Sequence, residues 1–119
     1  FEAPDVLALT QQTRALMPEI TLSVTVPHIL PLDEQVELAE ALVNAGADLI
    51  QTEGGTSSQP KNAGTLGLIE KAAPTLAAAY SISRAVKVPV LCASGLSSVT
   101  IPMAIASGAS GVGVGSAIN

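Results

Sequence analysis

Two hydrophobic periods alternate along the chain and define its expected elements. Apolar residues recur every three or four positions in stretches typical of amphipathic helices: residues 1–19, 32–46, 66–72, 74–86 and a short segment before Gly108. Between them lie four strand-like segments, "ITLSVTVPH" (20–28), "ADLIQTEGG" (47–55), "VPVLCASG" (88–95) and "GVGVGS" (111–116). The predicted order is therefore α-β-α-β-α-β-α-β.

This alternation predicts an α/β fold with parallel strands joined by right-handed crossovers. Two architectures fit: a doubly wound sheet with its ligand at a topological switch point, and a (β/α)8 TIM-like barrel with its active site at the C-terminal strand ends. Strands covered on both faces are almost entirely apolar, whereas the first segment alternates Thr21, Ser23 and Thr25 with apolar residues. That pattern favours the barrel.

A complete barrel needs about 250 residues, and this chain has 119. Phe1 is an unusual first residue, and the predicted order begins on a helix and ends on a strand. We therefore expect residues 1–119 to form a single partial barrel domain of a longer protein. Because half a barrel leaves strand edges exposed, the missing half is expected in further residues or in another chain.

Composition and charge narrow the classes of partner. Apolar residues make up 48% of the chain, which is enough for a packed core. The formal net charge is -5 and the five Lys and Arg residues are scattered, so no basic surface for nucleic acid is expected. Cys92 is the single cysteine, which fits a reducing compartment, and no apolar run approaches the roughly eighteen residues of a membrane span.

Glycine turns follow the third and fourth predicted strands, and together they indicate an anion site. Glycine lets a ligand approach backbone N–H groups closely, and Ser97 or Ser98 can cap a helix whose first turn holds Pro102. In barrels the loops after the last two strands frequently hold phosphate. We therefore predict a phosphate site built by Gly95, Leu96, Ser97, Gly115 and Ser116.

The alternative is that these glycines serve only as helix caps and packing positions. "GVGVGS" has the spacing G-x-G-x-G rather than G-x-G-x-x-G and lies at the last strand, so it does not indicate a dinucleotide site. A Gly95→Val substitution is expected to separate the two interpretations, by blocking anion binding while barely touching the core.

Three stretches closely resemble the hypothetical chloroplast reading frame twenty-three family of cyanobacteria and algal plastids. They are "ITLSVTVPHILPLDEQVELAEALVNAGADLIQTEGGTSSQP", "GTLGLIEKAAPTLAAAYSISRAV" and "PVLCASGLSS", which together cover nearly the whole chain. The resemblance implies the C-terminal half of a TIM-like barrel, with four strand–helix units before Phe1 and a final helix after Asn119. It also implies the cyanobacterial cytoplasm or the plastid stroma, and it supplies no reaction.

More distantly, "ASGLS" with "ASGASGVGVGSAI" is similar to the phosphate motif of flavin-mononucleotide (FMN) barrels and ribulose-phosphate-binding barrels. This resemblance implies a phosphorylated ligand and leaves FMN open as a cofactor. Those families commonly carry a doubled glycine after the penultimate strand, and Leu96 stands at the second of these places. Because of this difference, the resemblance does not imply close backbone contacts with a flavin phosphate.

His28 and Glu53 are the candidates for acid–base chemistry. His28 is the only histidine and follows the first predicted strand, and neutral imidazole suits proton transfer near pH 7. Glu53 ends the second strand, where a carboxylate in a partly closed barrel mouth can act as a base. The alternatives are a loop histidine ordered by neighbouring prolines and a carboxylate that only bonds a neighbouring loop.

Three further residues are candidates for substrate binding. Gln51 shares the strand alternation of Glu53 and is expected to face the same barrel mouth, while Ser57 and Lys61 lie in a polar loop that can act as a lid. Cys92, inside the third strand, is expected to be a buried small hydrophobe. The spacing of His, Cys and acidic residues gives no metal site.

Three classes of function remain open. The first is an enzyme acting on a small phosphorylated or carboxylated metabolite, with His28 and Glu53 as its acid–base residues. The second is an FMN-binding oxidoreductase that uses the same anion site. The third is a non-catalytic regulatory or assembly subunit, which the fold does not distinguish from an enzyme.

Overall fold

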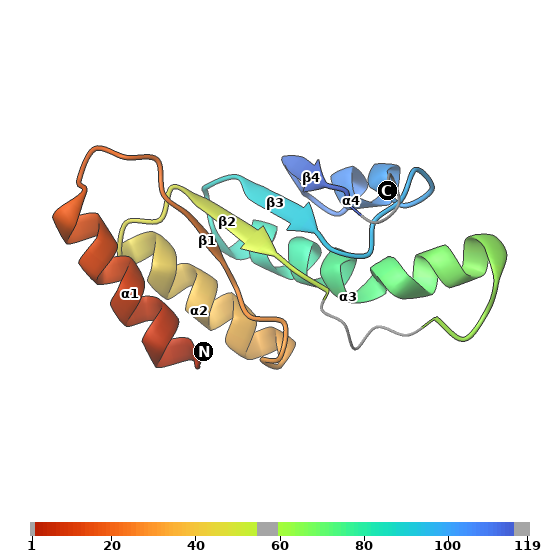
Figure 1. Cartoon of the computed structure of the whole chain (residues 1–119), viewed down its shortest axis with the longest axis horizontal. Coiled ribbons are helices and arrows are strands. Elements are labelled where there is room, and N and C mark those ends of the chain that lie inside the picture. The colour runs from red at the N-terminus through yellow and green to blue at the C-terminus, as the bar shows by residue number, and fades with distance from the viewer. Residues whose placement is uncertain (1, 55–59, 116–119) are drawn as a thin grey trace.

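The computed structural model describes residues 2–54 and 60–115. Helices and strands alternate along them in the predicted order (Figure 1): α1 (Ala3–Leu16), β1 (Ser23–Thr25), α2 (Leu32–Asn44), β2 (Leu49–Thr52), α3 (Gly64–Ala85), β3 (Val90–Ala93), α4 (Ile101–Ala106) and β4 (Gly111–Gly113). None of these helices is both long enough and apolar enough to cross a bilayer, within the part of the chain that is described.

The four strands form one parallel sheet in the order β1-β2-β3-β4. Each described strand therefore pairs with its neighbours in sequence, as in a barrel, and the order of these described strands does not reverse as it does at the switch point of a doubly wound sheet. The α/β class and the parallel arrangement are confirmed, and four strands in this order are consistent with part of a barrel.

Among the described residues, helices cover one face of the sheet and leave the other open. Ile50, Val90 and Cys92 point to the covered face and are at most 1% exposed. They pack with apolar side chains from α1, α2 and α3 around Ile50 and Val90, and from α3 and α4 around Cys92. Figure 1 shows α1, α2 and α3 along one side of the strands.

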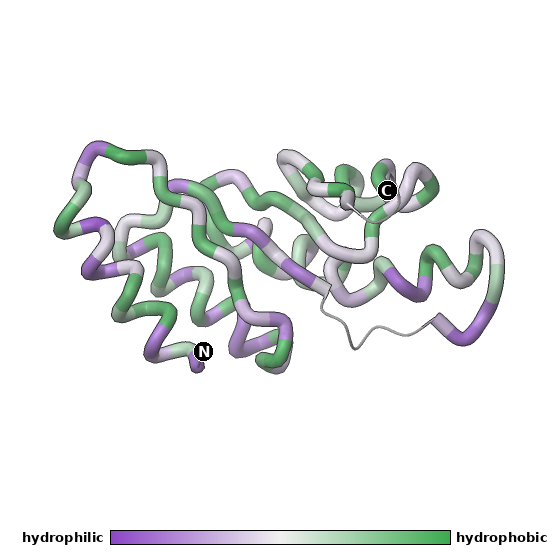
Figure 2. Tube along the Cα trace, viewed as in Figure 1, coloured by the Kyte–Doolittle hydropathy of each residue, from purple (hydrophilic) through white to green (hydrophobic). Residues whose placement is uncertain are grey.

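The uncovered face carries the polar positions expected from the alternation. Side chains alternate between the two faces of a strand, so Ser23 and Thr25 share this face, and both are exposed. Gln51, paired in register with Thr25 and Leu91, lies on the same face and is partly buried. Figure 2 shows the chain becoming hydrophilic toward the C-terminal end of β2, and that end holds the candidate site.

Helix α3 differs from its prediction. The sequence predicts two helical segments separated at Pro74, but the structure has one helix over Gly64–Ala85 with Pro74 inside it. Proline removes one backbone hydrogen bond, at a cost of about 3 kcal/mol in a helix interior. Burial of Ala72 and Thr75, both 0% exposed on either side of Pro74, offsets this cost.

Candidate functional site

His28 and Glu53 meet at the C-terminal ends of β1 and β2. Glu53 follows β2 directly, and His28 lies three residues beyond β1, after Pro27. Because the two strands are parallel neighbours, both side chains reach the same edge of the sheet. The His28 Nδ1 atom lies 2.8 Å from Glu53 Oε1, and the His28 backbone N–H donates to the same oxygen at 3.4 Å.

The pairing fixes which imidazole nitrogen carries the proton. A carboxylate only accepts hydrogen bonds, so Nδ1 must be the donor in the contact with Glu53. In the neutral ring Nε2 is then left with a free lone pair. The two side chains are 29% and 37% exposed, which leaves both within reach of a ligand from solvent.

A cavity of about 470 Å³ opens beside this pair. Its described lining combines three polar side chains with three apolar ones: Thr25, His28 and Glu53 with Val6, Pro27 and Ile29. Thr25 is a site residue that was not predicted from the sequence, although its polar position in an apolar strand was a usable signal. Gln51 lies on the same sheet face but is not part of this lining.

The loop after β3 has an unusual backbone. Ser94 and Gly95 both have positive φ, 73° and 74°, a conformation that glycine adopts readily and serine rarely. Leu96 is 4% exposed and packs in the core with Cys92. Among the described residues no acceptor bonds the backbone N–H of Gly95 or Leu96.

Ser97 and the start of α4 differ from expectation. The residue at the N-cap of α4 is Thr100, not Ser97 or Ser98, and Pro102 lies in the first turn as predicted. The Ser97 N–H already donates to Thr100 Oγ1 at 2.9 Å, and the Ser97 carbonyl accepts from Thr100 and Ile101. Ser97 thus stabilises the turn before α4, and its N–H is less available to a ligand than the sequence suggested.

The expectation that Gly95→Val would barely touch the fold is wrong. A Cβ atom on Gly95 would lie 2.7 Å from the backbone carbonyl oxygen of Lys71 in α3, and 3.4 Å from Lys71 Cγ. Any side chain at this position would push against the helix as well as adopt an unfavourable φ. The same contact places Lys71, which the sequence did not single out, beside the loop.

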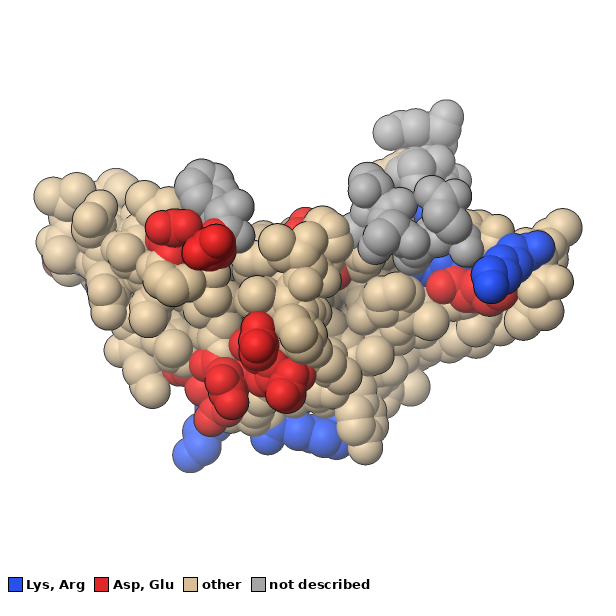
Figure 3. Space-filling model, turned by 90° about the horizontal axis from the view of Figure 1, so that it is seen from below, with Lys and Arg blue, Asp and Glu red and all other residues tan. Residues whose placement is uncertain are grey.

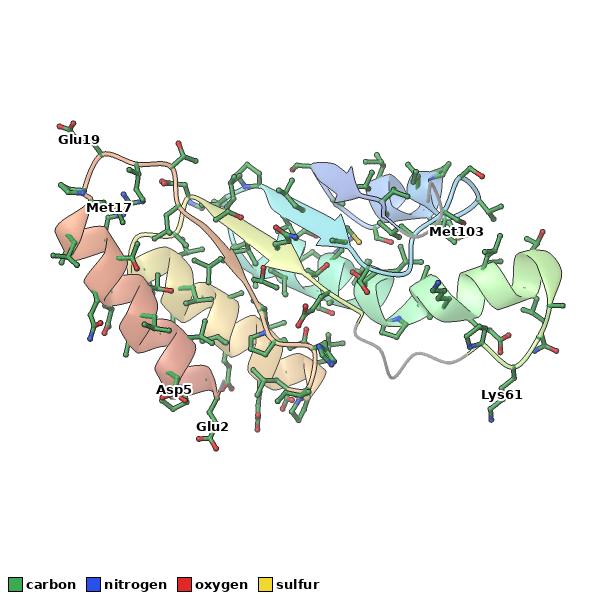
Figure 4. All side chains as sticks on the ribbon, viewed as in Figure 1. Glu2, Asp5, Met17, Glu19, Lys61 and Met103 are labelled. Carbon is green, nitrogen blue, oxygen red and sulfur yellow. The ribbon has the colours of Figure 1, made fainter. Side chains whose placement is uncertain are left out.

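The remaining predicted residues lie in three different situations. Gly115, like Gly95, lies two residues beyond the last paired residue of its strand, so the two share the C-terminal edge of the sheet. Lys61 is exposed, and Figure 4 shows it directed away from the sheet. Ser57 and Ser116 lie outside the described residues.

Cys92 is buried, as expected, within a small polar network. Its thiol donates to the Thr75 carbonyl at 3.6 Å and lies 3.4 Å from Thr75 Oγ1, which is 2.8 Å from Thr52 Oγ1. All three side chains are 0% exposed, so this network ties α3 to the sheet rather than facing a ligand. Across residues 2–54 and 60–115, no three His, Cys, Asp or Glu side chains are arranged to hold a metal ion.

FMN gains no specific support from the described loop. The second glycine of the flavin motif is replaced by Leu96, whose side chain is committed to the core. The Ser97 N–H, a further candidate donor to a phosphate, is bonded to Thr100. These residues therefore do not favour a flavin phosphate over the phosphate of any other ligand.

The family described as "Protein of unknown function (DUF561)" matches residues 1–119, and the chain belongs to this family. A protein named "Uncharacterized protein ycf23" from Porphyra purpurea is 44% identical over 118 residues, which are 99% of this chain and 44% of the relative. Its namesake from Cyanophora paradoxa is 46% identical over 115 residues, 97% of this chain and 47% of the relative. The chain thus spans less than half the length of these relatives.

Proposed function

We propose that this member of the DUF561 family belongs to an enzyme that moves a proton on a small phosphorylated metabolite, with His28 as the acid–base residue. The observation that carries the proposal is the 2.8 Å contact between His28 Nδ1 and Glu53 Oε1 at the edge of a cavity. A carboxylate that orients an imidazole beside an accessible pocket is a recurrent arrangement for proton transfer.

Each residue of the pair has a distinct role in this proposal. Nε2 of His28 takes a proton from a carbon or hydroxyl of the ligand, and the resulting imidazolium returns a proton to another ligand atom. Glu53 holds the ring in the Nδ1–H form and stabilises the imidazolium by its negative charge. Glu53 is thus a positioning residue rather than the base that the sequence suggested.

The ligand's phosphate is assigned to the loops after β3 and β4. The N–H groups of Gly95 and Leu96 have no acceptor among the described residues, and Gly115 lies on the neighbouring strand end. Adjacent parallel strands are about 4.8 Å apart, so the loop after β4 lies roughly 10–15 Å from Glu53 and His28, and the loop after β3 roughly 5–10 Å. That distance suits a metabolite of a few carbon atoms.

We also propose that the uncovered face of the sheet lines the interior of a closed (β/α)8 barrel, completed by chain that this segment does not contain. Within the described residues the sheet has two free edges, β1 and β4, and its uncovered face holds Thr25 and Gln51. The C-terminal strand ends would then form the active-site mouth. Such a protein would act in the cyanobacterial cytoplasm or the plastid stroma.

Isotope exchange tests the catalytic role even while the substrate is unidentified. The full chain, meaning the longer protein with the completed barrel proposed above, is incubated in D₂O with a mixture of small phosphorylated sugars and keto acids. NMR then detects deuterium in each compound. We expect exchange in at least one compound, and we expect the exchange rate to be lower by about 100-fold or more in His28→Gln. Glu19→Gln is the control for Glu53→Gln, since Figure 4 shows Glu19 at the opposite end of the sheet.

Two results would contradict the proposal. Exchange at an unchanged rate in His28→Gln would remove the histidine from the chemistry. Equal rates in Glu53→Gln and Glu19→Gln would show that orientation of the imidazole by Glu53 contributes nothing.

A further inference from the structure

The cavity beside His28 has a lining that is unsuited to phosphate. Its described polar groups are the Glu53 carboxylate, the His28 imidazole and the Thr25 hydroxyl, and the described lining holds no Lys or Arg. Glu53 uses Oε1 to bond His28, whereas no described residue bonds Oε2. A carboxylate oxygen with free acceptor capacity attracts an N–H donor and repels an anion.

The surroundings of the cavity are also acidic. The first turns of α1 and α2 carry Asp5, Asp33 and Glu34. Val6 follows Asp5 directly and lines the cavity, and Pro4 of α1 and Glu34 of α2 line one neighbouring hollow, so both turns lie at this end of the molecule. Figure 3 shows acidic side chains gathered over the α1–α2 half. A negative potential at the entrance favours a cationic group over an anionic one.

The loop after β3 has the opposite character. Lys71 Cγ lies 3.4 Å from the position a Cβ would take on Gly95, so the lysine side chain begins beside this loop. Gly95 and Leu96 add N–H groups with no described acceptor. Along one sheet edge, acceptor groups at β1 and β2 thus give way to donor groups at β3, roughly 5–10 Å away.

We propose that the cavity binds the amino group of a small ligand whose phosphate lies at the Gly95 loop, so that the ligand is an amine-bearing phosphate monoester. This inference rests on the proposed function and adds the amine. The ammonium donates to Glu53 Oε2 and Thr25 Oγ1, and its carbon stem packs against Val6 and Ile29. Lys71 supplies the charge that faces the phosphate.

Three matched probes test the assignment: phosphoethanolamine, ethyl phosphate, which lacks the amine, and ethanolamine, which lacks the phosphate. Each is titrated into the full chain by calorimetry and by the imidazole NMR signal of His28, assigned with His28→Gln. We expect phosphoethanolamine to bind roughly ten-fold or more tightly than ethyl phosphate. The advantage should disappear in Glu53→Gln and persist in Glu19→Gln.

The outcomes separate this inference from the proposed function. Equal binding of phosphoethanolamine and ethyl phosphate would overturn the amine assignment and leave the phosphate site standing. Binding of ethanolamine as tight as that of phosphoethanolamine would support the amine pocket and overturn the phosphate assignment. Binding of none of the probes would overturn the amine assignment, while the isotope-exchange experiment still decides whether His28 moves a proton.

Discussion

Gly95 lies so close to α3 that the loop after β3 has room only for a glycine at that position. Its φ of 74° and the 2.7 Å approach of a Cβ to the Lys71 carbonyl oxygen act together against any side chain. Gly115 is in the opposite situation, since nothing described lies within 4 Å of a Cβ placed there. The two glycines that the sequence presents as a pair therefore have different roles in the fold.

We predict that Gly95→Ala destabilises the protein by about 2 kcal/mol or more, because it adds both an unfavourable φ and a contact with backbone. Gly115→Ala is the matched control and should stay within about 0.5 kcal/mol of the parent. Urea unfolding followed by circular dichroism measures both. Equal stability of the two variants would mean that the loop shifts freely away from α3.

His28 and Glu53 show how far single residues were predictable. Their places at strand ends followed from the hydrophobic alternation. Their contact did not, because it depends on the register that pairs Thr25 with Gln51 and on the path of the loop after Thr25. Lys71 was missed because its neighbour in space, Gly95, is far away in sequence and the two belong to different elements.

Arg14 joins the elements at the end of the sheet opposite the candidate site. Its guanidinium donates to the Gly46 carbonyl at 2.6 Å and the Ile20 carbonyl at 2.9 Å, and contacts Asp48 Oδ2 at 2.7 Å. Asp48 also accepts from the Leu22 backbone N–H at 2.9 Å. One side chain thus connects the end of α1 to the loops that enter β1 and β2.

We predict that Arg14→Met lowers stability by about 2 kcal/mol, since several charged hydrogen bonds to backbone carbonyls are lost. Lys87→Met, at an exposed position, is the control. Chemical unfolding at neutral pH measures the difference. A loss no larger than that of Lys87→Met would show that water replaces these bonds at no cost.

The Arg14 contacts also predict a pH dependence. The Leu22 N–H and then Arg14 lower the pKa of the Asp48 carboxyl. A lowered pKa in the folded state gives stability that is present above the unfolded value and lost as the pH falls below about 4. The unfolding midpoint of the parent should therefore fall more steeply between pH 5 and about 3 than that of Asp48→Asn. Parallel curves for the two proteins would contradict this linkage.

At Pro74, packing outweighs the tendency of proline to end a helix. Its ring predicts a helix break, but burial of Ala72 and Thr75 on the sheet keeps α3 continuous. Pro74 itself is exposed. We predict that Pro74→Ala stabilises the fold by about 1–2 kcal/mol, because it restores a helix hydrogen bond and loses only some rigidity of the unfolded chain. Thermal unfolding measures the gain, and a destabilised variant would mean that the proline itself is needed for packing.

At the scale of the whole molecule, residues 2–54 and 60–115 form a sheet that helices cover on one face only. Helices cover the side of Ile50 and Cys92, while Thr25 and Gln51 lie on the open face. The α/β class and strand order were predictable because hydrophobic periods report burial directly. Closure into a barrel is a proposal, since it depends on contacts with chain outside this segment.

Barrel closure predicts slow hydrogen exchange at the free edge of β1. In the segment alone, the Thr25 N–H points away from β2, because Val26 N–H is the neighbour that donates to Gln51. In the full chain a further strand would accept from Thr25. Exchange measured on both proteins should show protection of this amide only in the full chain. Equal, fast exchange in both would contradict a closed barrel at this edge.

The proposed chemistry depends above all on Glu53 holding His28 with its proton on Nδ1, so that Nε2 is free to act. Imidazole ¹⁵N NMR of the full chain measures this protonation state, because the shifts of the two ring nitrogens distinguish a protonated nitrogen from one with a free lone pair. We predict that the neutral ring of His28 is protonated on Nδ1 in the parent and in Glu19→Gln, and shifts toward the Nε2–H form in Glu53→Gln. A parent ring protonated on Nε2 would contradict the role given to Glu53 and with it the proton transfer at His28.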